Sequence, residues 1–149
     1  MPRRDAQEHP GRRRHPPATA LAARRAAPLS TPRTLGAAGE DAACRWLAQC
    51  GLDVVARGFR SRYGEIDVVA LDRGTVVFVE VKTRTPGGIA PPADAVTGLK
   101  RHRLVRTAAL WLARARAGES PCRFDVIEVE PREGRWRIRH RRDAFRPGD

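Results

Sequence analysis

Apolar residues recur at two different spacings along this chain, and the spacings predict its helices and strands. Helical spacing predicts a helix over residues 34–50, before Gly51, and a longer helix over 93–117, before Gly118. The Gly- and Pro-rich stretch 84–92 is expected to form a loop. Short runs rich in Val, Ile and Phe predict five strands, at 52–59, 65–71, 75–83, 122–130 and 135–141. The order αβββαββ predicts an α/β fold, a layered sandwich around one central mixed sheet.

The second and third strands form a hairpin whose register follows from its turn. With a two-residue loop at 73–74, Asp67 faces Glu80 and Glu65 faces Lys82. All four side chains then lie on one face, at the end of the hairpin away from the turn. Nearer the turn both faces are apolar, so we expect the hairpin to be central in the sheet and covered on both sides.

The acidic end of this hairpin predicts a metal site. Two carboxylates that face each other repel unless a cation lies between them, and Mg²⁺ prefers oxygen ligands of this kind. Lys82 lies on the same face, where it could orient or deprotonate a water molecule or hold a phosphate oxygen. The alternative is a salt-bridged patch in which Glu65 pairs with Lys82 and Asp67 pairs with an arginine.

The charge balance predicts a polyanionic partner. The chain has 149 residues, with 29 basic and 17 acidic residues and a net charge of +12, which favours nucleic acid or an acidic membrane surface. All but two of the basic residues are Arg; the two lysines are Lys82 and Lys100. A lysine kept in so Arg-rich a chain indicates a role that Arg cannot fill. Lys100 lies on the apolar face of the second helix, where snorkelling to the rim of the core is the alternative.

The second helix is strongly basic around Lys100. Arg101, Arg103 and Arg106 follow it, and no acid lies between Asp94 and Glu119. This composition predicts a surface that contacts phosphates, and a merely solvated face is the alternative.

Several classes of protein are excluded or disfavoured. No apolar run approaches the roughly 20 residues that a membrane helix needs, and the N-terminus has no signal-peptide core, so we expect a cytoplasmic protein that does not enter a membrane. Three cysteines without a CxxC pair disfavour a disulfide framework and a zinc ribbon. The common nucleotide-binding and acyl-transfer motifs are absent from the sequence.

The chain divides into a basic arm, a folded domain and a short tail. Residues 1–33 contain eight Arg against two acids, many prolines and no aromatic residue, which predicts a disordered arm. The arm either contacts phosphates or is only a solvated extension from an early start codon. Residues 34–146 are expected to form the domain, and 147–149 the tail.

Several short motifs stand out along the chain: Gly39-Glu40, Gly64-Glu65-Ile66-Asp67, Phe78-Val79-Glu80-Val81-Lys82, Lys100 and Arg123-Phe124-Asp125. Together they resemble the bacterial YraN family. The resemblance covers Leu35 to Phe145, and one departure is Arg57, where the family usually has Asn. The family is assigned to the restriction-endonuclease-like PD-(D/E)XK superfamily and is similar to archaeal Holliday junction resolvases.

The resemblance implies a restriction-endonuclease-like three-layer sandwich and a metal-dependent nuclease. Asp67, Glu80 and Glu40 would hold Mg²⁺ or Mn²⁺, and Lys82 would complete the catalytic set by positioning the attacking water. The partner would be nucleic acid, with DNA favoured and branched or structured DNA included; a homodimer is left open. The residues expected to contact nucleic acid are Lys100, Arg101, Arg103, Arg106 and Arg84.

Two other classes of function remain open at this stage. The same fold could bind nucleic acid without cleaving it, since a fold does not establish an activity. A basic scaffold protein that contacts ribosomes or membranes is a third class.

Overall fold

The helices and strands follow one another in the order that the sequence predicts. The computed structural model describes residues 34–87 and 96–149, so the predicted arm at 1–33 and part of the predicted loop at 84–92 lie outside the described residues. The elements are α2 (Leu35–Gln49), β1 (Asp53–Ser61), β2 (Gly64–Asp72), β3 (Thr75–Thr83), α3 (Gly98–Arg114), β4 (Cys122–Arg132) and β5 (Arg135–Phe145).

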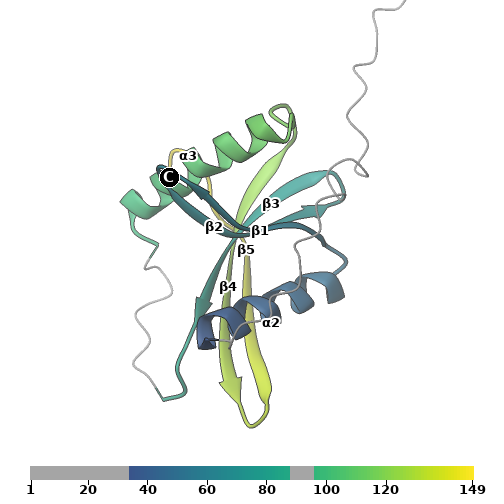
Figure 1. The fold of residues 1–149 in the computed structure, drawn as a ribbon, viewed down its shortest axis with the longest axis vertical. Coiled ribbons are helices and arrows are strands. Elements are labelled where there is room, and N and C mark those ends of the chain that lie inside the picture. Colours follow the sequence, from purple (N-terminus) through teal and green to yellow (C-terminus); the bar gives the residue numbers. More distant parts are fainter. Residues whose placement is uncertain (1–33, 88–95) are drawn as a thin grey trace, which may run out of the picture.

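The five strands form one mixed sheet between two helices. Their spatial order is β1-β2-β3-β4-β5; β3 and β4 run parallel, and the other neighbours run antiparallel. Helix α2 lies on one side of the sheet and α3 on the other (Figure 1). The α/β three-layer sandwich predicted from the sequence is therefore confirmed. Neither helix in the described ranges combines the length and apolarity that crossing a bilayer requires.

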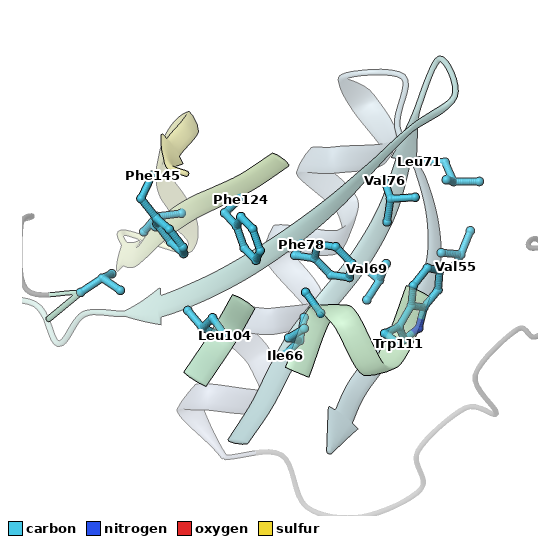
Figure 2. Close-up of a cluster of buried hydrophobic side chains, with 13 residues drawn as sticks. Val55, Ile66, Val69, Leu71, Val76, Phe78, Leu104, Trp111, Phe124 and Phe145 are labelled. Atoms are coloured by element: carbon cyan, nitrogen blue, oxygen red, sulfur yellow. The ribbon is translucent and has the colours of Figure 1, made fainter. Parts of the chain in front are cut away.

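A separate apolar core fills each side of the sheet. Under α3, a row of aromatic rings runs from Phe145 through Phe124 and Phe78 to Trp111, with centroids 4.8, 5.4 and 5.8 Å apart in turn (Figure 2). Under α2, Leu47 packs among valines and isoleucines of the central strands. Because both faces of the β2–β3 hairpin are buried, its predicted central position is confirmed.

Helix α3 is shorter than the apolar pattern predicts. It begins at Gly98, because the Thr97 hydroxyl accepts a hydrogen bond from the Lys100 backbone N–H at 3.3 Å and caps the first turn. It ends at Arg114, and Arg116 adopts a left-handed conformation with φ of 54° beyond it. The predicted span of 93–117 is therefore wrong at 96–97 and at 115–117; residues 93–95 lie outside the described part.

The predicted register of the β2–β3 hairpin holds only in the half nearer the turn. The backbone pairs run from the turn as far as Val68 with Val79 and match the predicted register. The pairs expected beyond that point, Asp67 with Glu80 and Glu65 with Lys82 among them, are not formed. Instead the Asp67 Oδ2 accepts a hydrogen bond from the Val81 backbone N–H at 2.8 Å. The side chain therefore takes the place of a ladder bond where the strands separate.

A glycine lets α2 approach the sheet at the same end. A Cβ atom built on Gly39 would overlap the Thr83 hydroxyl and lie 2.9 Å from Val129 Cγ2. Only a residue without a side chain fits there, and the close approach sets Glu40, the next residue, beside the ends of the strands.

We therefore expect Gly39→Ala to destabilise the fold. Overpacking of this kind costs about 1–3 kcal/mol. Gly36→Ala is the matched control in the same helix, because its Cβ would meet nothing closer than the Thr34 hydroxyl at 3.9 Å. Better helix propensity should leave the control neutral or stabilised by up to about 1 kcal/mol. Chemical denaturation measures the free energy of unfolding of both variants. Equal changes in the two variants would contradict the close packing of α2 against the sheet.

Candidate acid–lysine site

Two acidic side chains meet where β2 and β3 separate. Asp67 is half-buried on β2, and Glu80 is buried on β3 with 9% of its surface exposed. Burial raises the pKa of Asp67 to about 7, and the charge of Glu80 raises it in the same direction. Within residues 34–87 and 96–149, no cation forms an ion pair with Asp67. Burial and the charge of Glu80 therefore both oppose the ionisation of Asp67.

Glu40 lies at the edge of this pair. Burial raises its pKa, the charge of Arg57 lowers it, and the charges of Glu65 and Glu80 raise it again, so the acids lie within electrostatic range of one another. Among the described residues, however, no three Asp, Glu, His or Cys side chains form a group that could hold a metal ion. The predicted three-acid set of Glu40, Asp67 and Glu80 is therefore not assembled into one ligating group.

Arg57 is a site residue that the sequence reasoning did not identify as one. Its guanidinium lies 2.8 Å from Asp41 Oδ1 and 3.8 Å from Glu40 Oε2, so it links β1 to α2 and offsets the negative charge there. The only sequence signal was the departure from the usual Asn of the family.

The two lysines of the chain both lie at this site. The Lys100 Nζ, from α3, forms an ion pair with Glu80 Oε1, while 45% of the Lys100 side chain stays exposed. Lys82 is half-buried on β3, two residues after Glu80. Burial lowers the pKa of Lys82, as do the charges of Lys100 and Arg84, whereas Glu80 opposes this shift.

The alternative of a salt-bridged patch is not what forms. In the described part of the chain, Lys82 has no salt bridge, and Glu65 pairs with Arg60 at 3.5 Å between Oε2 and Nε. Lys82 is thus a cation held among acids without a fixed ion-pair partner. We name Asp67, Glu80, Lys82 and Lys100 the acid–lysine site.

The other predicted nucleic-acid contacts divide into two pairs. Arg103 and Arg106 are exposed on α3 and line an open hollow beside the acid–lysine site. Arg101 is half-buried, with its guanidinium 5.6 Å from the Phe145 ring centroid. Arg84 is held by Glu128, with 3.1 Å between Nη2 and Oε1. The open surface therefore carries two of these four arginines, and the other two are directed inward.

The motif Arg123-Phe124-Asp125 has a structural role. Asp125 is 1% exposed and bonds to His140 Nε2 at 2.8 Å, while it accepts from Arg123 Nε at 3.0 Å and the Asp143 backbone N–H at 2.9 Å. Although burial opposes ionisation, the bonds from His140 and Arg123 hold the pKa of Asp125 below its ordinary value. This network ties β4 to β5.

Asp67→Asn should stabilise the metal-free domain at pH 8. An Asp carboxyl in an unfolded chain ionises near pH 4, whereas burial raises the pKa of Asp67 to about 7. Between these values the fold keeps a proton that the unfolded chain has released, so stability at this position falls as pH rises through 7. At pH 8 we expect the substitution to raise the free energy of unfolding by about 1 kcal/mol, or Tm by roughly 3–5 °C. This increase should shrink toward zero near pH 4. Thermal unfolding in EDTA measures it.

Asp72→Asn on the same strand is the control, with the opposite sign. A hydrogen bond from Arg123 Nη1 at 2.8 Å, together with the charges of Arg123 and Arg142, holds the pKa of Asp72 below its ordinary value. The ionised form of Asp72 stabilises the fold, so Asp72→Asn should lower Tm at pH 8 and lose its effect as pH falls. Two variants that shift Tm alike would contradict the burial and repulsion assigned to Asp67.

Comparisons with known proteins agree on one family. The family model described as "Uncharacterised protein family UPF0102" matches residues 39–129. A UPF0102 protein of Symbiobacterium thermophilum is 50% identical over 114 residues, covering 76% of this chain and 97% of the relative. A UPF0102 protein of Nocardia farcinica is 50% identical over 97 residues, 65% of this chain and 76% of the relative. A UPF0102 protein of Rhodococcus opacus is 45% identical over 112 residues, which cover 74% of this chain and 95% of the relative. The chain therefore belongs to the UPF0102 family, which is the YraN family that its motifs indicate.

Proposed function

We propose that the protein is a metal-dependent nuclease that hydrolyses phosphodiester bonds in DNA, branched or structured DNA included. The observation that carries the proposal is the half-buried Asp67 beside the buried Glu80, with no cation from the described residues paired with Asp67. A fold gains no stability from two buried like charges, so their presence supports a cation-dependent function.

The donor set fits Mg²⁺ or Mn²⁺. Asp67 and Glu80 would hold the ion, and Glu40 would act from the edge of the pair. Two carboxylates suffice, because Mg²⁺ keeps several waters and takes its remaining ligands from substrate phosphate. When bound, the ion would supply Lewis-acid polarisation of the scissile phosphate.

The lysines would act on the water and the phosphate. Lys82 would hold the attacking water in line with the phosphorus, because it lies near Glu80 and forms no salt bridge with a described residue. Lys100, which is half-exposed beside the same acid, would neutralise charge on a phosphate oxygen as it develops. Hydrolysis then joins the water oxygen to phosphorus, breaks the bond to the 3′ oxygen, and leaves a proton on that oxygen.

A non-catalytic nucleic-acid-binding module is the second candidate. One observation favours it: the Lys100 ammonium pairs with Glu80 and so neutralises one of the two acids without a metal. In this case the site would be a structural ion pair at the rim of a phosphate-binding surface.

A cleavage screen separates the two candidates. Duplex, single-stranded, flap and four-way-junction DNA are incubated with Mg²⁺ or Mn²⁺. The nuclease proposal expects cleavage that Asp67→Asn and Glu80→Gln each reduce by about 10²-fold or more. Glu130→Gln is the matched control, since this acid pairs with Arg132 on β4, lines neither hollow beside the site and should leave the rate unchanged. DNA binding without cleavage of any substrate would decide for the binding module.

Lys82→Arg tests the role of the lysine in the same assay. The variant keeps the charge but cannot place a compact ammonium beside Glu80. DNA binding and Tm should change little, while the cleavage rate should fall by about 10²-fold. A fully active Lys82→Arg enzyme would show that only charge is needed at this position.

A further inference from the structure

Beside the acid–lysine site, the turn between β1 and β2 is held against α3. The Ser61 Oγ lies 2.9 Å from Thr107 Oγ1, which ties the turn to the helix. Tyr63, the next residue but one, has the Arg106 guanidinium 4.6 Å and the Arg62 guanidinium 4.8 Å from its ring centroid. A guanidinium that stacks on an aromatic ring is restricted in its motion, so these cations are set in place before any ligand arrives.

These side chains surround an open hollow of about 510 Å³, which we name the arginine hollow. Arg62, His102, Arg103 and Arg106 contribute basic groups to its wall, and none of the described residues that line it is acidic. Such a wall suits a phosphate group, which accepts charge-assisted hydrogen bonds from arginine.

The arginine hollow also offers apolar contact, which a phosphate alone does not need. Its wall includes Tyr63 and Leu99, and Leu99 is 63% exposed, although it is a large apolar residue. A nucleobase needs an apolar or aromatic surface of this kind once it leaves its stack. A paired duplex keeps its bases inside and would present only its backbone to these two side chains.

The arginine hollow continues toward the acid–lysine site. A second hollow, of about 270 Å³, shares Tyr63, Leu99 and Arg103 with it and is also lined by Glu65 and Lys100. Because Lys100 contacts Glu80, a strand lying in the two hollows would run toward the buried acids.

The geometry points to the arginine hollow as the site of an unpaired nucleotide of a DNA strand. The base lies against Tyr63 and Leu99, and its phosphate binds Arg103 and Arg106. The adjoining phosphates follow the second hollow toward Lys100, so the substrate class is DNA with a single-stranded segment. This last step rests on the proposed nuclease function, whereas the nucleotide site itself does not.

Binding in EDTA tests the site apart from cleavage. The probes are a single-stranded oligothymidylate and a blunt duplex with the same number of phosphates. Tyr63→Ala should weaken binding of the single strand by about tenfold or more and that of the duplex much less, while Tyr63→Phe should bind like the wild type. Equal losses on both probes, or no loss on either, would overturn the proposal.

A second pair of variants controls for charge alone. Arg106→Ala should weaken binding of the single strand by several-fold more than Arg45→Ala does. Arg45 is the matched control, because it is exposed on α2 and lines a hollow with Trp46 and Trp136 on the other side of the sheet. Equal losses from the two variants would mean that the DNA is held by net charge and not by the arginine hollow.

The tyrosine itself supplies a direct probe that needs no substitution. Tyr63 is the only tyrosine of the chain, so protein labelled with 3-fluorotyrosine gives a single fluorine resonance. That resonance should move when oligothymidylate is added in EDTA and move much less with the duplex. A resonance that ignores the single strand overturns the nucleotide site. If instead it moves but no DNA is cleaved with metal, the site stands and the proposed nuclease function falls.

Discussion

Repulsion between two buried carboxylates is the constraint around which this end of the fold is arranged. Asp67 and Glu80 come from neighbouring strands, and burial together with the charge of Glu80 raises the pKa of Asp67. The hairpin does not close up over them. Its backbone ladder ends at Val68 and Val79, and the Asp67 carboxylate bonds to the Val81 N–H instead. Strands β2 and β3 are thus no longer paired at the position of the two acids.

Helix α3 and strand β1 bring positive charges to the edge of this acid pair. Helix α3 brings the ammonium of Lys100 to Glu80 from one side of the sheet. Helix α2 approaches from the other side because Gly39 has no side chain, and Arg57 moderates the charge of Glu40 there. Cations thus reach the edge of the acid pair, while Asp67 itself has no ion pair with any described residue. That asymmetry supports a bound metal ion as the missing partner.

The spacing of apolar residues and the turn residues predicted the fold and the two central acids, because both signals depend only on residues close together in the sequence. The turn after Asp72 fixes the hairpin register as far as Val68 and Val79. Contacts between distant segments could not be predicted in this way. The separation of the strands at Asp67 depends on a side-chain bond to Val81, and the start of α3 depends on the cap at Thr97. The same holds for Arg57, whose acidic partners lie on another element.

Calorimetric titration of Mn²⁺ into the metal-free protein tests the central claim most directly, because it needs no substrate. The wild type should bind the ion, and Asp67→Asn and Glu80→Gln should each weaken that binding by about tenfold or more, since each removes a charged oxygen ligand. Glu130→Gln should bind as the wild type does, because that acid is paired with Arg132 on β4. Equal heats of binding for the wild type and all three variants, or no binding by the wild type, would contradict a metal site at this acid pair.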